Sequence, residues 1–275
     1  MNEFLMIFFD KAGSEEADPN FLLKMDNIAL YQDVVVLAIE LQEFSLYFQP
    51  IVNTLTLAED FQHYEALIRW EHPIKGMIPP DHFIHIAEKS GAIIPLGYWV
   101  IHEVCRCLSQ PSVPQNVSVS INLSPVQFKE ASLVQSIVKI IKSYGISTNR
   151  ITIEITETSA MRDHQLTRKV FAAFHAEGFK LSMDDFGTGY SSLSYLLNFN
   201  FDIIKIDKSF IANTLVDGEY EIIAKAVVKL AHDLSLIVVC EGIETDDQLQ
   251  MVSEWKTDFI QGYLISKPRP WSEFY

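Results

Sequence analysis

The sequence predicts an α/β fold, specifically a (β/α)8 TIM-like barrel with an antiparallel first strand. Strand-like and helix-like segments take turns from residue 82 to residue 265, and this alternation is typical of parallel strands joined by crossover helices. The chain has 275 residues, of which 48% are hydrophobic, and this is enough to build one large core. Eight predicted strands in this length favour a closed barrel over an open sheet.

The first two predicted strands are expected to run antiparallel to each other. Apolar residues at helical spacing in 20–44 predict a helix, and the aromatic and β-branched run FSLYFQPIV (44–52) predicts a strand. The next strand ends in EALIRW (65–70) after a link too short for a crossover helix. We therefore expect these two strands to form an antiparallel hairpin.

The remaining elements follow in alternation. The pattern predicts helices at 82–90, 95–109, 131–144, 163–177, 190–198, 219–234 and 245–255, and strands at 117–122, 151–155, 180–184, 202–206, 236–240 and 259–265. In a parallel barrel the carboxyl ends of the strands share one face, and catalytic groups gather there.

Side chains able to hold a metal ion or a phosphate stand at or near the ends of seven predicted strands. They are Glu65, Asn122, Glu154, Asp184 with Asp185, Lys205 with Asp207, Glu241 and Gln261. Each has an ordinary structural reading, such as a buried ion pair for Lys205 and Asp207. Carboxylates are rarely buried without a partner, however, so their repetition on nearly every strand predicts that they converge on one point.

The donor types indicate the chemistry of that point. Carboxylate and amide oxygens without His or Cys suit Mg²⁺ or Mn²⁺ rather than Zn²⁺. The tandem Asp184-Asp185 before the glycine-rich FGTGYSS predicts one carboxylate shared by two cations, which is the usual device for attack of water on a phosphodiester. Arg69 could grip a phosphate through its planar guanidinium. Ca²⁺, which accepts looser coordination, should permit binding and inhibit turnover.

Composition excludes several other functions. A formal net charge of −15 and a pI near 4.9 argue against tracking DNA or RNA. No stretch reaches the length of uncharged apolar sequence that crosses a bilayer, so we expect no membrane segment in this chain. The cysteines Cys105, Cys107 and Cys240 form neither an even disulfide set nor a C-x-x-C pattern, which favours a reducing, cytoplasmic location.

Ordered motifs carry a resemblance to a known family. They are QPIV (49–52), EALIRWEHP (65–73), INLSPVQF (121–128), EITET (154–158), DDFGTGYSSLSYL (184–196), IKIDKSFI (204–211), EGIET (241–245) and QGYLISKP (261–268). Over residues 44–270 the chain resembles the EAL-domain cyclic di-GMP phosphodiesterases of bacteria. The resemblance implies a barrel with a reversed first strand that hydrolyses cyclic di-GMP to linear pGpG with two Mg²⁺ or Mn²⁺ ions.

The resemblance also implies residue roles. Glu65, Asn122, Glu154 and Asp184 match the ligands of one metal, and Asp184, Asp185 and Glu241 match those around the second. The implied catalytic residues are Lys205, Glu241, Asp207 and Gln261, of which Lys205, Asp207 and Gln261 match positions near the attacking water. Arg69 and Gln49 match positions that contact the substrate, and Glu157 matches the residue that anchors the DFGTGYSS loop, which resembles a loop linked to dimerisation. We therefore expect a homodimer.

Some expectations concern the rest of the chain. Residues 1–25 resemble a segment that joins an upstream GGDEF or sensory domain to an EAL domain, and residues 26–275 are expected to form the phosphodiesterase domain. His63 departs from the family pattern, which has a small residue there, and a packed, hydrogen-bonded histidine is the favoured interpretation. The alternative function is a non-catalytic cyclic di-GMP receptor or interaction module on the same fold.

Overall fold

The computed structural model describes residues 28–57, 61–156, 163–187, 196, 199–214 and 218–275. The chain divides into two compact units. The first comprises residues 1–45 and 68–99, and the second comprises residues 46–67 and 100–275. The lead-in at 1–25 lies outside the described residues, as does nearly all of the helix expected at 190–198.

The first unit is built from helices around an aromatic cluster. It contains α2 (Ile28–Glu40), β3 (Gly76–Ile78), α3 (Pro80–Ser90) and the start of α4 (Ile93–Leu108). The Phe44 ring lies 5.1 Å from Trp70 and 5.8 Å from Phe83, and the Trp70 and Phe83 rings meet edge to face. Such pairs add specific geometry to the burial of large apolar surfaces. The indole of Trp70 donates a hydrogen bond to Glu43, so its polar group is satisfied.

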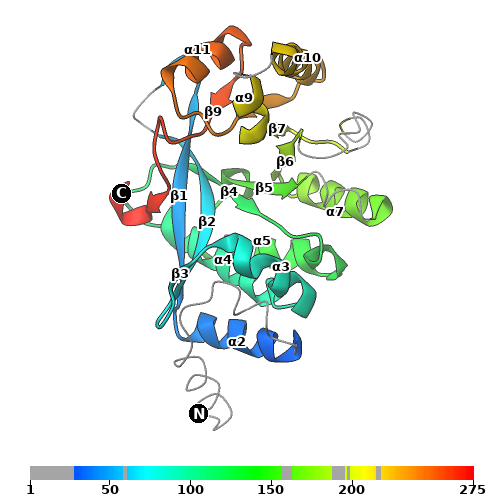
Figure 1. The fold of residues 1–275 in the computed structure, drawn as a ribbon. Helices are drawn as coiled ribbons and strands as arrows, with labels where there is room; N and C mark the ends of the chain where they lie inside the picture. Colours follow the sequence, from blue (N-terminus) through cyan, green and yellow to red (C-terminus); the bar gives the residue numbers. More distant parts are fainter. Residues whose placement is uncertain (1–27, 58–60, 157–162, 188–195, 197–198, 215–217) are drawn as a thin grey trace. The chain divides into compact units, whose positions relative to one another are not determined.

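The second unit carries a ring of strands (Figure 1). The ring strands are β1 (Phe44–Asn53), β2 (His63–His72), β4 (Ser118–Asn122), β5 (Ile151–Thr156), β6 (Lys180–Phe186), β7 (Ile203–Ile206), β8 (Ile237–Cys240) and β9 (Phe259–Ile260). They pair in the order β1-β9-β8-β7-β6-β5-β4-β2, and the pairing of β1 with β2 closes the ring. The neighbouring pairs β2–β4, β4–β5, β5–β6, β6–β7, β7–β8 and β8–β9 are all parallel. In contrast, β1 is antiparallel to β9. The expected barrel with a reversed first strand is confirmed.

Helices and side-chain alternation place the core outside the ring and polar groups inside it. The second unit also contains α5 (Leu133–Ser143), α7 (His164–Ala176), α9 (Lys208–Thr214), α10 (Gly218–Asp233) and α11 (Asp246–Glu254). On β5, Ile151, Ile153 and Ile155 are fully buried. Glu154 points to the opposite face because successive strand residues alternate. Polar side chains such as that of Glu154 therefore line the ring interior, as the alternation in the sequence predicts.

The structure differs from the expected elements in four places. The strand expected at 259–265 ends at Ile260, because the chain turns at Gly262, whose carbonyl accepts from Ile265 and Ser266. Residues Lys208–Thr214 form α9, which the helical pattern did not predict. Two short strands, β3 and β10 (Arg269–Pro270), extend the sheet at β2 and β1. Among the described residues, no helix is long and apolar enough to cross a membrane.

Candidate active site

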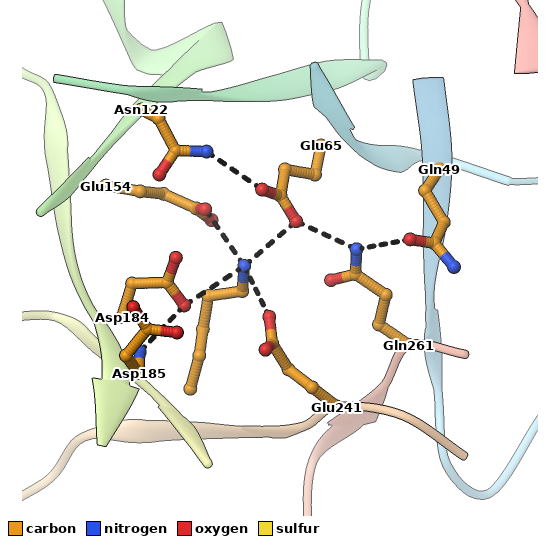
Figure 2. Close-up of polar contacts among 9 residues, drawn as sticks. Gln49, Glu65, Asn122, Glu154, Asp184, Asp185, Glu241 and Gln261 are labelled. Atoms are coloured by element: carbon orange, nitrogen blue, oxygen red, sulfur yellow. Dashed lines mark hydrogen bonds and ion pairs between the residues drawn. The ribbon is translucent and has the colours of Figure 1, made fainter. Parts of the chain in front are cut away.

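Four carboxylates, carried on three strands and directly after a fourth, surround one buried lysine. Nζ of Lys205 on β7 lies 3.0 Å from Glu65 Oε2, 2.9 Å from Glu154 Oε2, 3.4 Å from Asp184 Oδ1 and 2.6 Å from Glu241 Oε1. Figure 2 shows the side chains of Glu65, Glu154, Asp184 and Glu241 pointing to a common centre. The predicted convergence is therefore present, and a lysine ammonium occupies its centre.

Burial makes this cluster electrostatically demanding. Burial alone would lower the pKa of Lys205, but Asp184, Glu154, Glu241 and Glu65 raise that pKa well above its usual value. The ammonium therefore stays charged at neutral pH. Burial raises the pKa of Glu154, and it raises the pKa of Glu241 to about 8. One lysine does not compensate this many acids, so the cluster favours a further positive charge.

Amide groups hold Glu65 from its other side. Asn122 Nδ2 donates to Glu65 Oε1 over 2.9 Å, and Gln261 Nε2 donates to Glu65 Oε2 over 2.8 Å. Gln261 Nε2 also donates to Gln49 Oε1 (Figure 2). Gln49 Nε2 donates to the carbonyl of Ser266. Burial raises the pKa of Glu65, but Lys205 and these hydrogen bonds outweigh that effect and lower it overall. Glu65 is thus an ionised, fixed carboxylate.

A break in the regular strand brings two consecutive aspartates to the cluster. Consecutive strand residues normally point to opposite faces. The register of β6 with β7 shifts between Met183 and Phe186, and Asp185 has φ 57°, a left-handed conformation that aspartate tolerates better than most residues. Such bulges re-aim side chains. Burial, with repulsion from Asp184 and then Asp207, raises the pKa of Asp185 to about 6.

Two glycines allow the backbone to approach closely beside the site. Gly242 follows Glu241 with φ 68°, and a Cβ there would lie 2.2 Å from Lys208 Cβ. Gly262 follows Gln261, and its Cβ would lie 2.1 Å from the carbonyl oxygen of Ile243. Both glycines stand in the sequence motifs EGIET and QGYLISKP, but no role was assigned to them from the sequence. The signal was present, since each glycine directly follows a predicted site residue.

The remaining predicted residues make other contacts or lie outside the described residues. Asp207 accepts hydrogen bonds from the backbone and hydroxyl of Ser209 and so caps the start of α9, rather than pairing with Lys205. Arg69 belongs to the first unit, where its guanidinium donates to the carbonyl of Ile68. Glu157 and most of the DFGTGYSS loop lie outside the described residues.

The donor set fits a hard divalent cation. Glu65, Glu154 and Asp184 each offer an oxygen, these atoms lie within 4.8 Å of one another, and all three residues are buried. Asn122 adds an amide whose oxygen and nitrogen exchange places on a half-turn of the side chain. Oxygen donors of this kind suit Mg²⁺ or Mn²⁺. This group could hold a metal ion, with Asp185 and Glu241 supplying further carboxylates beside it.

Comparisons with known proteins show which family the chain resembles. The chain is 36% identical over 235 residues to a bifunctional diguanylate cyclase/cyclic di-GMP phosphodiesterase, MucR of Pseudomonas aeruginosa, covering 85% of this chain and 34% of that protein. It is 35% identical over 242 residues to a probable cyclic di-GMP phosphodiesterase, PdeN of Escherichia coli, covering 87% of this chain and 46% of PdeN. The solved PaMucR phosphodiesterase, in complex with c-di-GMP, matches with a TM-score of 0.83 and 33% identity. That match covers 90% of this chain and all of the solved one.

The matches cover most of this chain but only part of its curated relatives. The chain spans only about a third of the first curated relatives it matches, with 33%, 27% and 28% of their lengths covered. Within the chain itself, the family model described as EAL domain matches residues 33–268 and so includes every strand of the ring. The chain therefore belongs to the EAL domain family.

Proposed function

We propose that this protein is a cyclic-guanylate-specific phosphodiesterase that hydrolyses cyclic di-GMP to linear pGpG with two Mg²⁺ or Mn²⁺ ions. The observation that carries the proposal is the gathering of Glu65, Glu154, Asp184 and Glu241 around a single buried lysine. This arrangement concentrates negative charge that two cations would balance, and the cations would also attract the anionic phosphodiester. The relatives named as phosphodiesterases support the same substrate.

The donor set divides between two cations as the family pattern suggests. Glu65, Asn122, Glu154 and Asp184 would hold one, and Asp184, Asp185 and Glu241 would hold the second. When bound, the cations would supply Lewis-acid stabilisation to the attacking and leaving oxygens of the phosphodiester. The bulge at Asp184 and Asp185 is what lets adjacent residues serve both positions.

Lys205 acts as a donor and a positive charge rather than as a base. Its raised pKa keeps the ammonium protonated at neutral pH. The ammonium lies within hydrogen-bond distance of carboxylates on both sides of the cluster, so it can orient a water molecule or stabilise negative charge that develops on the phosphate. A lysine here therefore contributes to the transition state without giving up its proton.

Gln261 offers an acceptor to the attacking water. Its Nε2 is used by Glu65 and Gln49, whereas its Oε1 is buried and has no hydrogen-bond partner among the described residues. A buried acceptor without a partner is costly unless a ligand or water satisfies it. We assign that place to the attacking water, with Asp207 steadying the neighbouring backbone at the start of α9.

Substrate contacts and partners extend the proposal. Gln49 is held by Gln261 and Ser266 and would present its amide to the substrate, and Arg69 would contact a phosphate. We also propose that residues 26–275 form the catalytic domain, that it acts as a cytoplasmic homodimer with Glu157 anchoring the DFGTGYSS loop, and that a GGDEF or sensory domain accompanies it.

One experiment separates the enzyme from a receptor. Purified protein is incubated with cyclic di-GMP in EDTA, Mg²⁺, Mn²⁺ or Ca²⁺, and the nucleotides are separated by chromatography. Formation of pGpG with Mg²⁺ or Mn²⁺ only is expected. Binding of cyclic di-GMP without product in any metal would instead assign the receptor function to this chain.

A further inference from the structure

A cavity opens at the end of the strand ring opposite the carboxylate cluster. It has a volume of about 210 Å³, and many of its lining residues are the first residues of their strands, among them His63, Ser118, Lys180, Ile237 and Phe259. Glu154 lies further along the ring and also lines the cavity. The cavity therefore occupies the amino-terminal half of the ring interior, whereas the cluster around Lys205 occupies the carboxyl-terminal half.

Small hydroxylated residues create this space. Barrel interiors are usually filled by layers of bulky branched side chains. Here the ring carries Ser118 and Ser120 on β4, Thr152 on β5 and Ser182 on β6. Ser182 lies on the same face of β6 as Lys180 and Asp184, is fully buried, and has no hydrogen-bond partner for its hydroxyl among the described residues. Ser182 does not line the cavity, so the small hydroxylated residues on the cavity wall are Ser118, Ser120 and Thr152.

The cavity has one polar wall and one apolar wall. Hydroxyl and amide groups of β4, β5 and the loops before them face Ile203, Ile237, Val239 and Phe259. An apolar cavity of about 150 Å³ is sufficient to bind benzene. This cavity is larger, so it can take a molecule with a single ring, and burial of that ring against the apolar wall would be favourable.

The charges at the cavity point to an anion. The guanidinium of Arg150 already donates hydrogen bonds to the carbonyls of Val117 and Pro114 and to the side chain of Gln115. Lys180 is exposed and has no ion-pair partner within the described residues, although the chain has a net charge of −15. Glu154, the carboxylate among the lining residues, is paired with Lys205 over 2.9 Å. The one uncommitted ammonium beside hydroxyl groups suits a carboxylate ligand better than a doubly charged phosphate.

His63 gives the polar wall a second available group. Its Nδ1 lies 2.7 Å from Ser118 Oγ, and its ring packs edge to face on Phe259. Its Nε2 has no hydrogen bond to any described residue and is available to a bound molecule. His63, which departs from the family pattern, thus lines the cavity.

We propose that this cavity, which shares only Glu154 with the carboxylate cluster, is a second ligand site that takes a ring-sized organic carboxylate. The carboxylate group lies by Lys180 and His63, and the ring lies against Phe259, Ile237 and Val239. The proposal depends on the lining of the ring interior and holds whether or not the protein hydrolyses cyclic di-GMP.

Benzoate is the probe that tests the site. Histidine ring resonances of ¹⁵N-labelled protein are followed during titration with benzoate, benzyl alcohol and acetate, with His63→Gln used for assignment. Millimolar benzoate should shift the His63 resonances, whereas benzyl alcohol, which lacks the charge, and acetate, which lacks the ring, should bind at least about tenfold more weakly.

Matched lysine variants locate the anionic end. Lys180→Met should weaken benzoate binding by about tenfold, because it removes the charge and keeps the length of the stem. Lys229→Met removes an exposed lysine paired with Asp233 on α10 and should leave the affinity unchanged. Absence of a His63 shift in benzoate would mean that the cavity holds only water and would overturn the proposal. Equal benzoate affinity in wild type and Lys180→Met would overturn it as well.

Discussion

Nζ of Lys205 lies 2.6 Å from Oε1 of Glu241, the shortest of the contacts that this ammonium makes with four carboxylates. The lysine is 1% exposed, so these interactions act with little screening by water. Its positive charge stands where a cation would balance the same acids. The metal-free site is therefore held together by a residue that the proposed reaction also needs.

Lys205→Met should destabilise the metal-free protein. The substitution keeps most of the buried stem and leaves Glu65, Glu154, Asp184 and Glu241 without their shared cation. Loss of one partner of a buried ion pair costs about 3–5 kcal/mol, and we expect a decrease of that size in the free energy of unfolding in EDTA. Urea denaturation measures it. Lys229→Met, which removes the exposed ion pair with Asp233, should change the free energy of unfolding by less than about 1 kcal/mol. Equal stability of Lys205→Met and wild type would contradict the electrostatic role.

Stabilisation by metal should grow as the pH rises. The pKa of Asp185 is raised to about 6 and that of Glu241 to about 8, so the metal-free folded state binds more protons than the unfolded state. Its stability therefore falls as the pH rises from about 4 through about 8. A cation would displace those protons, so the increase in melting temperature caused by Mn²⁺ should be larger at pH 7.5 than at pH 5.5.

Calorimetry with Mn²⁺ or EDTA at the two pH values provides the measurement. Asp185→Asn removes one of the titrating groups and should reduce the difference between them. A metal-induced shift of the same size at both pH values would argue against cation binding by these carboxylates.

Glu65→Gln should abolish most of the activity and retain the fold. Glutamine has the shape of glutamate, so it keeps one acceptor for Gln261 or Asn122, while it loses the charge that a divalent cation requires. Substitution of a residue that hydrogen-bonds to a metal ligand typically lowers metal affinity or activity about 10–100-fold. Substitution of a ligand itself should therefore lower kcat/KM by at least about 100-fold. Circular dichroism checks the fold. Glu71→Gln, an exposed glutamate further along β2, is the control and should keep full activity.

Sequence patterns predicted the fold because each strand of the ring carries its own local signal. The alternation of isoleucines with Thr152 and Glu154 on β5 is one such signal, and the buried isoleucines confirm it. The same pattern failed in residues 261–265, where FIQGYLI reads as a strand. There the close approach of Gly262 to Ile243 turns the chain, and no local pattern records a contact between segments distant in sequence.

The site was predictable as a gathering of acids but not in its internal arrangement. Strand ends locate Glu65, Glu154 and Asp184 on one face of a parallel ring. Which side chain reaches the centre depends on the stagger of the strands, so the position of Lys205 among four carboxylates could not be derived. Asp207 shows the same limit, because the capping of α9 by its carboxylate depends on where that helix begins.

Gly262→Ala should damage both stability and activity through a steric effect. A Cβ at this position would lie 2.1 Å from the carbonyl oxygen and 2.3 Å from the nitrogen of Ile243, and neither backbone atom can move without disturbing the hydrogen bond from Ile243 to the carbonyl of Gln261. Overpacking of this kind costs about 1–3 kcal/mol. Because the neighbouring Gln261 binds Glu65, the displacement should also lower kcat.

Gly145→Ala is the matched control for this change. Gly145 has φ 69°, and a Cβ added there would meet no atom within 4 Å, so alanine adds backbone strain of about 1–2 kcal/mol without a collision. Both variants should lose stability in urea denaturation, and only Gly262→Ala should also lose turnover of cyclic di-GMP. Unchanged turnover in Gly262→Ala would show that Gln261 keeps its place without the close approach, and that the amide network around Glu65 is set by β9 alone.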